Sequence, residues 1–250
     1  MELKKEFLDK LSCADKIVFF TGAGISAESG ISTFRGADGL WSKLKPEELA
    51  NFDAFLRNPD MVWEWYQYRR KIINESQPNA GHKAIADMQS TFESVIVSTQ
   101  NIDNLHRRAG SKTVYELHGN IERNYCLNCG KKFDSKDFSY TGKAPLCDCG
   151  GRIRPDIVWF GEFLPEKEFA ASEKAAADCD IMFVVGTSAV VYPAAQIPLV
   201  ARSAGAYVVE VNMEETDLSR RANYSILGKS GEILPVIANM ASQMRSKEVK

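Results

Sequence analysis

The sequence lacks an excess of charge of either sign. Its 250 residues include 31 Lys and Arg against 33 Asp and Glu, which gives a formal net charge of −2, and the sequence pI is about 6.0. A chain with this balance has no overall electrostatic attraction to nucleic acid. We therefore expect no direct nucleic-acid partner.

Signals for export or membrane insertion are also missing. Residues 1–10 alternate Lys and Glu, and Leu3, Phe7, Leu8 and Leu11 follow helical spacing, so this segment is neither a secretory signal nor a membrane span. We expect a cytoplasmic monomer with no membrane partner. The sequence has no internal repeat and no low-complexity tract, and at 44% hydrophobic it can bury a large core as one domain or one and a half.

Short apolar runs recur along the chain, and several of them are separated by segments with helical spacing. The runs are 17–21, 95–99, 114–117, 181–186 and 207–212, and the helical segments include 81–89, 193–203 and 233–244. Nearly all-apolar runs are typical of strands covered on both faces. The pattern predicts an α/β fold with a Rossmann-like, mostly parallel sheet and helices on both faces.

Two stretches interrupt this alternation. Residues 40–76 are rich in aromatic side chains, and residues 124–154 hold four of the six cysteines. We expect a helical insertion at 40–76 and a zinc-binding insertion at 124–154, which together form a small domain. The large domain then comprises residues 1–39, 77–123 and 155–250.

The clustered cysteines form a C-x-x-C pair and a C-x-C pair: Cys126, Cys129, Cys147 and Cys149. Free thiols and disulfides are the alternatives, and the expected compartment disfavours disulfides. Two close pairs joined by a loop suit a tetrahedral structural zinc. Four thiolate ligands leave no open position, so the metal should hold the module together rather than take part in chemistry. Cys13 and Cys179 stand alone in apolar surroundings, which favours simple packing.

A glycine-rich turn follows the first apolar run. Gly22-Ala23-Gly24 begins a G-x-G-x-x-A pattern, which is typical of a pyrophosphate-binding turn. The acidic residue that usually follows about 20 positions later, at the end of a second strand, is missing. Thr33-Phe34-Arg35 follows the turn instead. The turn predicts a dinucleotide, but the loop after it needs a separate explanation.

Polar residues stand at the carboxyl ends of the later strands. They are Gln100, Asn101 and Asp103, then His118, then Gly186, Thr187 and Ser188, and finally Asn212. Ligands bind at these ends of parallel sheets, so the side chains should converge on the glycine turn. His118 could act as a general base, although a single histidine is more often structural. Asn101 and Asp103 could instead cap a helix beginning near Ile102.

These blocks, in this order, resemble the sirtuin family of NAD-dependent protein-lysine deacylases. The motifs are GAGIS with TFRG, TQNID, HGN, the four cysteines, IVWFGE, GTSAVVYPAA and VN, and they span residues 17 to about 235. The resemblance implies that the GAG turn contacts the NAD diphosphate. It also implies that the segment through Phe34 and Arg35 is a loop that orders over the ribose and nicotinamide. A missing acidic ribose clamp is expected in this variant of the fold.

The resemblance further implies roles for single residues. His118 would be the general base, and Asn101 and Asp103 would be the other catalytic residues. The acyl oxygen would attack C1′ of the nicotinamide ribose, giving nicotinamide, free lysine and O-acyl-ADP-ribose. The cofactor-binding residues would be Gly22, Ala23, Gly24, Glu28, Thr33, Phe34, Arg35, Gln100, Asn101, Asp103, Gly186, Thr187, Ser188, Asn212 and Ser230. Val158, Phe160 and Gly161 would bind an acyl-lysine protein substrate as an added strand.

The segment WEWYQYRR bears on the acyl group. Tyr66 and Arg69 lie three residues apart on an expected helix, hence on one face. Y-x-x-R at this place resembles the sirtuin subclass that removes succinyl and malonyl groups, with Ala50 as a small residue in the same pocket. A guanidinium beside a phenol suits a distal carboxylate. Alternatively, Tyr66 packs at the core edge, Arg69 extends to solvent, and the enzyme is a plain deacetylase.

Two further functions remain open at this stage. In a mono-ADP-ribosyltransferase, another nucleophile would capture the same C1′ centre, and the absence of O-acyl-ADP-ribose would reveal it. In a zinc-ribbon module that binds NAD without catalysis, Asn101, Asp103 and His118 together would exceed what binding requires. The sequence therefore favours a deacylase.

Overall fold

A six-stranded parallel sheet forms the centre of the molecule. The computed structural model describes residues 3–34, 39–40, 45–139 and 141–248. The strand order is β3-β2-β1-β7-β8-β9, and every neighbouring pair is parallel. The strands are β1 (Lys16–Thr21), β2 (Ser94–Thr99), β3 (Thr113–Glu116), β7 (Ile181–Val185), β8 (Tyr207–Asn212) and β9 (Tyr224–Leu227). Five of them coincide with the predicted runs, whereas the short edge strand β9 was not predicted.

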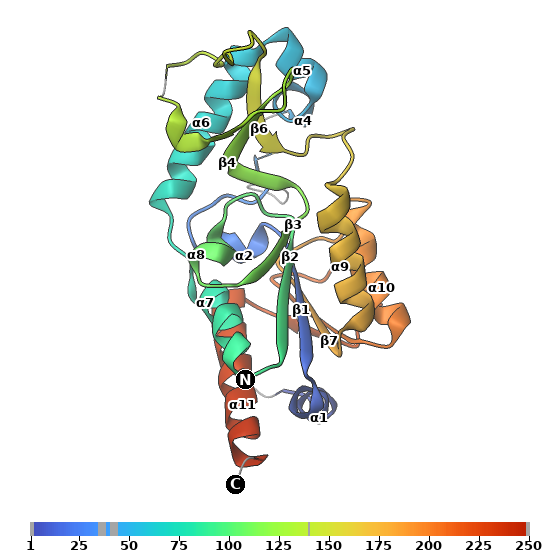
Figure 1. Cartoon of the computed structure of the whole chain (residues 1–250). Coiled ribbons are helices and arrows are strands. Elements are labelled where there is room, and N and C mark those ends of the chain that lie inside the picture. The colour runs from blue at the N-terminus through green and yellow to red at the C-terminus, as the bar shows by residue number, and fades with distance from the viewer. Residues whose placement is uncertain (1–2, 35–38, 41–44, 140, 249–250) are drawn as a thin grey trace.

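Helices cover both faces of this sheet (Figure 1). One layer holds α1 (Lys5–Cys13), α7 (Ala80–Asp87) and α11 (Ser230–Glu248), and the other holds α9 (Glu166–Asp178) and α10 (Ile197–Ala204). Alternate strand residues serve the two layers, because Ile17 and Phe19 belong to the first core cluster while Val18 and Phe20 belong to the second. The predicted α/β fold class is confirmed.

The helix α7 is tied to the short helix α2 (Gly24–Ala27) by its N-cap. Asn79 accepts hydrogen bonds from the N–H groups of Gly81 and His82, and its amide donates to Ile25 O (2.7 Å). One side chain thus satisfies the start of α7 and fixes it beside the glycine turn.

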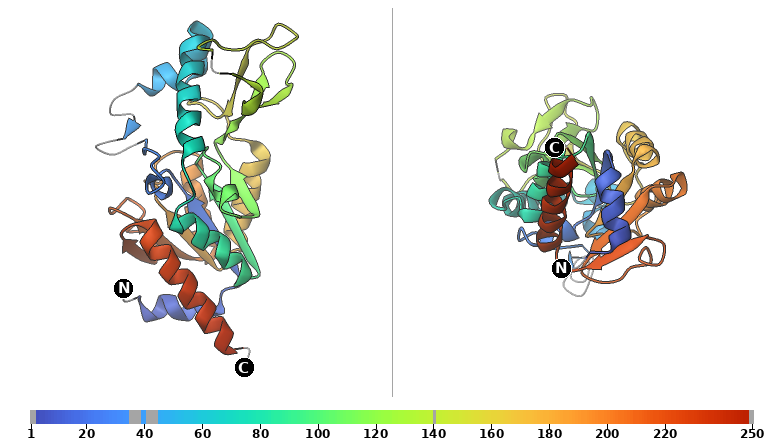
Figure 2. Two further views of the ribbon diagram at one scale, coloured as in Figure 1. Left: turned by 90° about the vertical axis from the view of Figure 1, so that its left-hand side faces the viewer. Right: turned by 90° about the horizontal axis from the view of Figure 1, so that it is seen from below.

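A smaller module lies at the end of the molecule away from α1 and α11 (Figure 2). It contains α4 (Pro46–Leu49), α5 (Phe52–Arg57), α6 (Pro59–Glu75) and an antiparallel sheet in the order β5-β4-β6. These strands are β4 (Gly119–Cys126), β5 (Lys132–Asp134) and β6 (Ile153–Ile157). The expected domain boundaries at 123/124 and 154/155 fall inside β4 and β6, because both strands run on into the module. The division into two domains stays a prediction.

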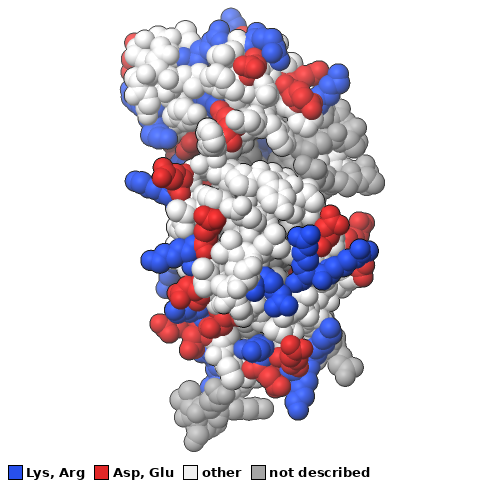
Figure 3. All heavy atoms as spheres, turned by 90° about the vertical axis from the view of Figure 1, so that its right-hand side faces the viewer, with Lys and Arg blue, Asp and Glu red and all other residues white. Residues whose placement is uncertain are grey.

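Among the described residues, the remaining short elements are α8 (Leu105–Arg108) and the 3-10 turns η1 (Met88–Ser90), η2 (Ser135–Asp137) and η3 (Ala194–Gln196). Within the described ranges, no helix is both long and apolar enough to cross a membrane. On the face in Figure 3, Lys and Arg side chains are interspersed with Asp and Glu around an uncharged area near the centre.

Candidate active site at the strand ends

The glycine turn lies directly against the end of β7. Gly22 N–H donates to Val185 O (3.0 Å), and Gly24 N–H donates to Gly186 O (2.8 Å). A Cβ at Gly24 would lie 2.7 Å from Gly186 Cα, and one at Gly22 would lie 2.6 Å from Thr187 Cβ. Only glycine permits this approach, so these residues bring the ends of β1 and β7 together.

Thr187 connects the ends of β2 and β8 to the glycine turn. The Gln100 amide donates to Thr187 Oγ1 (2.9 Å), and the Asn212 amide donates to Thr187 O (3.0 Å). Ser188 follows half-buried. The predicted polar strand ends therefore converge on the glycine turn.

Asn101 and Asp103 lie buried beneath this turn. Ser26 O–H donates to Asp103 Oδ2 (2.7 Å), and the Asn101 amide donates to Gly22 O (3.0 Å) and Ser26 Oγ (3.2 Å). Burial raises the pKa of Asp103, and hydrogen bonds from Leu105 N–H and Ser26 oppose the rise. Ser26 thus connects both predicted catalytic side chains, although the sequence alone had not singled it out.

The capping alternative is correct in part. The helix α8 begins at Leu105 and not near Ile102, because Asn104 adopts the left-handed region (φ 60°) immediately before it. Asp103 does accept a hydrogen bond from Leu105 N–H (2.9 Å). Asn101 takes no part in the cap and turns to the glycine loop instead.

The structure sets the tautomer of His118. Its Nδ1 lies 3.0 Å from Gln100 O, and a carbonyl oxygen can only accept, so Nδ1 carries the proton. The lone pair is therefore on Nε2. Burial lowers the pKa of His118, and the Gln100 carbonyl partly opposes this by favouring the charged form. A neutral imidazole with a free Nε2 lone pair is what a general base requires.

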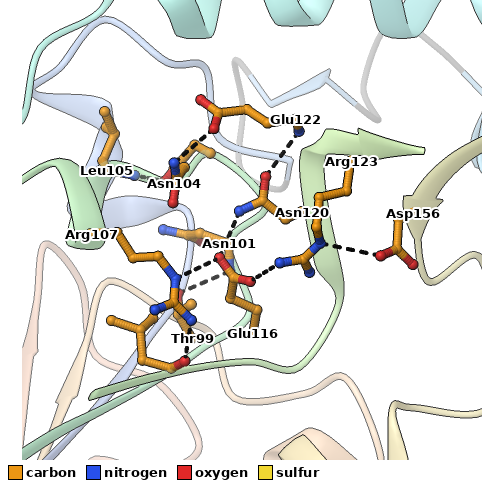
Figure 4. Close-up of polar contacts among 12 residues, drawn as sticks. Thr99, Asn101, Asn104, Leu105, Arg107, Glu116, Asn120, Glu122, Arg123 and Asp156 are labelled. Carbon is orange, nitrogen blue, oxygen red and sulfur yellow. Dashed lines mark hydrogen bonds and ion pairs between the residues drawn. The ribbon is translucent and has the colours of Figure 1, made fainter. Parts of the chain in front are cut away.

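The carboxylate of Glu116 is buried at the end of β3, just before the turn that includes His118. Figure 4 shows its polar contacts. Glu116 is 5% exposed and accepts hydrogen bonds from Arg123 (2.8 Å) and Asn120 (2.6 Å). Arg107 of α8 pairs with the same carboxylate at 3.4 Å, and Arg123 continues to Asp156 of β6 (3.2 Å). These contacts tie α8, β3, β4 and β6 together around the His118 turn.

Two further histidines are buried beside the site. The ring centroids of His82 and His106 are 4.8 Å apart. His106 Nε2 lies 2.9 Å from Thr21 Oγ1, and His82 Nε2 lies 3.5 Å from Ser26 Oγ. Burial lowers the pKa of His82 to about 4 and holds the pKa of His106 well below its ordinary value. No sequence spacing indicates that these two histidines lie side by side, so the sequence did not single them out.

Tyr66 and Arg69 lie in the interior of the small module. They are 2% and 3% exposed, and Tyr66 shares a core cluster with Ala50. The alternative in which Arg69 extends to solvent is therefore wrong. Burial lowers the pKa of Arg69, and the nearby Tyr66 and Asp103 partly oppose this. Its Nε has no hydrogen-bond partner among the described residues.

The segment after β6 lies between the His118 turn and the helical insertion. Val158 N–H donates to His118 O (3.0 Å), and Phe160 N–H donates to Ala50 O (3.0 Å). A cavity of about 380 Å³ opens beside it, lined by Asn51, Phe52, Asp53, Phe160, Gly161 and Glu162. The predicted peptide-binding residues thus lie close to the candidate base.

The four cysteines meet in one cluster. Their sulfur atoms all lie within 4.8 Å of one another, with Cys126 and Cys149 at 3.5 Å and Cys129 and Cys147 at 3.7 Å. A tetrahedral zinc with Zn–S bonds of about 2.3 Å would place the sulfurs about 3.8 Å apart. A Cβ at Gly151 would lie 2.6 Å from Cys126 Sγ, so glycine is needed beside the cluster. The residues fit a structural zinc.

The other predicted cofactor residues divide into two groups. Glu28 accepts hydrogen bonds from Ser230 Oγ (3.3 Å) and Gly231 N–H (2.9 Å), which places both predicted residues at the start of α11. The backbone carbonyl of Thr33 accepts a hydrogen bond from Leu40 N–H, and the Phe34 ring centroid lies 5.2 Å from the Arg69 guanidinium carbon. Arg35 lies outside the described residues.

Comparison with known proteins gives a consistent result. A family model described as the Sir2 family matches residues 22–193. The chain is similar to NAD-dependent protein deacylase 2 of Pyrobaculum aerophilum, with 47% identity over 242 residues that cover 96% of this chain and 97% of that protein.

Two solved structures are also similar. The crystal structure of a Sir2 homolog–NAD complex has a TM-score of 0.92 and 40% identity, and the match covers 98% of this chain and 96% of that one. A Sir2–p53 peptide–NAD+ structure has a TM-score of 0.85 and 35% identity, over 99% of this chain and 100% of that one.

Proposed function

The chain belongs to the Sir2 family, and we propose that its preferred substrates are lysine side chains carrying acidic acyl groups, such as succinyl and malonyl, with acetyl-lysine a weaker substrate. The general activity is NAD-dependent protein deacylation, which the relatives share. The relatives' structures contain NAD and a peptide, which supports a peptide-borne acyl-lysine as the second substrate.

His118 and the strand ends supply the chemistry in this proposal. NAD, when bound, supplies the C1′ centre that the acyl oxygen attacks as nicotinamide leaves. The Nε2 atom of His118 accepts a proton from a ribose hydroxyl, because its Nδ1–H donates to the carbonyl oxygen of Gln100. Asn101, Asp103 and Ser26 form a preorganised polar floor under the glycine turn. Such fixed groups orient the reactants and need no rearrangement during the reaction.

The buried Arg69 guanidinium carries the proposed acyl preference. Its side chain is 3% exposed, it forms no ion pair with any described carboxylate, and its Nε is without a hydrogen-bond partner among the described residues. Asp103 influences the pKa of Arg69, yet the two do not pair. The Phe34 and Trp65 ring centroids lie 5.2 and 5.9 Å from its guanidinium carbon and partly stabilise the charge. No described carboxylate neutralises it, and a buried cation without a paired anion is costly. The distal carboxylate of a succinyl group supplies that anion, whereas an acetyl group does not.

The test compares two peptides that differ only in the acyl group. We expect kcat/KM to be higher for succinyl-lysine than for acetyl-lysine in the wild-type protein. Arg69→Met should lower kcat/KM for the succinyl peptide by tens to thousands of fold, because a desolvated carboxylate left unpaired costs on the order of 2–5 kcal/mol. The acetyl peptide should lose activity only through altered packing.

Two controls accompany this test. Arg57→Met makes the same substitution at an exposed arginine of α5 and should leave both peptides unaffected. Mass spectrometry should detect O-acyl-ADP-ribose, and finding ADP-ribosylated protein alone would exclude deacylation. Equal losses on both peptides in Arg69→Met would show that the acyl preference is wrong and that Arg69 is structural.

A further inference from the structure

Trp159 fixes the hydroxyl group of Tyr66. The indole Nε1–H donates to Tyr66 Oη at 2.8 Å, and the two ring centroids are 6.2 Å apart. Both side chains are 2% exposed. An indole nitrogen can only donate, so the tyrosine oxygen must be the acceptor in this bond. The tyrosine proton is therefore directed elsewhere, and within the described parts of the chain no acceptor for it is found.

Trp159 is itself held from several sides. The guanidinium carbon of Arg154 lies 3.4 Å from the indole ring centroid, and Phe55 packs at 5.4 Å. Glu162 accepts a hydrogen bond from the Trp159 backbone N–H (2.8 Å) and forms a bidentate ion pair with Arg154. A rigid indole keeps the donor direction constant, and the adjacent cation draws electron density from the ring and strengthens the N–H as a donor.

We infer that Trp159 is a specificity-determining residue that positions the Tyr66 hydroxyl as a hydrogen-bond donor to the carboxylate of an acidic acyl group beside Arg69. This inference rests on the proposed acyl preference. Without the indole N–H, the phenol could turn its proton to either side of its ring and would lose its fixed direction. Trp159 lies on the segment expected to hold the peptide backbone, so one short segment serves both the backbone and the acyl end of the substrate.

The phenol remains protonated in this environment. Burial raises the pKa of Tyr66, and the hydrogen bond from Trp159 opposes this only in part. Tyr66 therefore keeps the proton that it is to donate. Next to a cationic Arg69, a neutral donor and a charged donor together match a carboxylate, which only accepts.

The test uses Trp159→Phe, Tyr66→Phe and the double variant with succinyl- and acetyl-lysine peptides. The readout is the ratio of the two kcat/KM values, because a general loss from packing lowers both alike. We expect Trp159→Phe to lower the succinyl-to-acetyl ratio by about 2- to 10-fold, as the loss of one neutral hydrogen bond would. In the Tyr66→Phe background the same change should leave the ratio unaltered, because no hydroxyl remains to be positioned.

A second variant guards against a packing defect in Trp159→Phe. Replacing Trp159 with 3-benzothienylalanine keeps the ring shape and removes only the N–H, and it should lower the ratio to the same degree. An unchanged ratio in this variant, or a drop that persists in the Tyr66→Phe background, would overturn the role of Trp159. If the wild-type protein instead prefers acetyl-lysine, the proposed acyl preference itself is wrong and this inference falls with it. A preference that depends on Arg69 but not on Trp159 would refute the inference alone.

Discussion

At the residue scale, His118 gives a pH prediction. Its pKa is lowered from the ordinary value of 6.5 by burial, so the imidazole stays neutral until the solution is more acidic than that. Protonation removes the Nε2 lone pair, and activity should be lost as the pH falls through the lowered pKa. We expect kcat/KM to be flat near neutrality and its acid midpoint to lie below pH 6.5, measured in buffers of constant ionic strength.

The His118→Ala variant provides the control for that profile. Its residual activity should lack the acid midpoint, whereas a midpoint caused by Asp103, whose pKa is raised, would persist. A wild-type midpoint at or above pH 6.5 would contradict the lowered pKa of His118, and a midpoint that persists in His118→Ala would contradict its assignment as the base. NAD binding measured over the same range separates loss of affinity from loss of chemistry.

Single residues also show how far the sequence could lead. The convergence of Gln100, Asn101 and His118 was predictable, because strand ends of a parallel sheet share one edge. The contact between Trp159 and Tyr66 joins residues 93 positions apart, and no local pattern indicates that an indole N–H meets a phenol oxygen. Ser26 is similar, since its hydrogen bond to Asp103 depends on the turn between β2 and α8, where the capping alternative expected the start of a helix.

At the element scale, buried apolar runs were the most predictable parts. The strands β1, β2, β7 and β8 lie between two helical layers, so their composition is nearly all apolar and stands out. The strand β9 pairs only with β8 and leaves Leu227 54% exposed, so it carries a weaker signal. The helix α9 buries only Ser172 and Ala176, which gave no clear apolar stripe.

The zinc cluster and α6 form one unit, which leads to a prediction for metal removal. Trp63 of α6 packs with Cys126, Cys147 and Ile153, and the buried Arg70 donates to Ile121 O of β4 (2.7 Å). The helix that carries Tyr66 and Arg69 therefore rests on the cluster. We expect about one zinc per chain, and chelation or Cys126→Ser should abolish activity on succinyl and acetyl peptides alike, because metal binding is part of the module's folding energy.

The contrast with Arg69→Met makes this test specific. Loss of zinc should lower both kcat/KM values together and increase hydrogen exchange in β4, β6 and α6, while β1 and β7 stay protected. Full activity after complete removal of zinc would refute the structural role. The matched control is Cys13→Ser, because this cysteine lies on α1, outside the cluster, and is exposed, contrary to the packing that the sequence predicted for it.

At the scale of the whole molecule, the site lies at the junction between the carboxyl ends of the parallel strands and the small module. Polar groups reach this junction from α7, α8 and the ends of β1 and β2, and they are joined by hydrogen bonds. The Nδ1 atoms of His82 and His106 are buried without a hydrogen-bond partner among the described residues. Burying polar groups costs stability unless they are hydrogen-bonded and uncharged. The free energy of unfolding should therefore depend on pH through the groups buried at this junction, in particular His82 and His106.

His82 carries the last prediction, which concerns stability. Its pKa is about 4 in the folded protein and near 6.5 when unfolded, so the unfolded chain binds a proton more readily between these values. Stability contributed by the neutral side chain is therefore present above pH 6.5 and is lost as the pH falls toward 4. Between about pH 7 and about pH 5, protonation linked to His82 should lower the free energy of unfolding by about 2 kcal/mol.

Denaturant unfolding of wild type and His82→Gln at both pH values isolates the effect of His82, because loss of zinc and titration of Asp103 are common to the two proteins. The wild-type protein should lose more stability on acidification than His82→Gln, and equal losses would show that His82 does not enter the folded core as a neutral group.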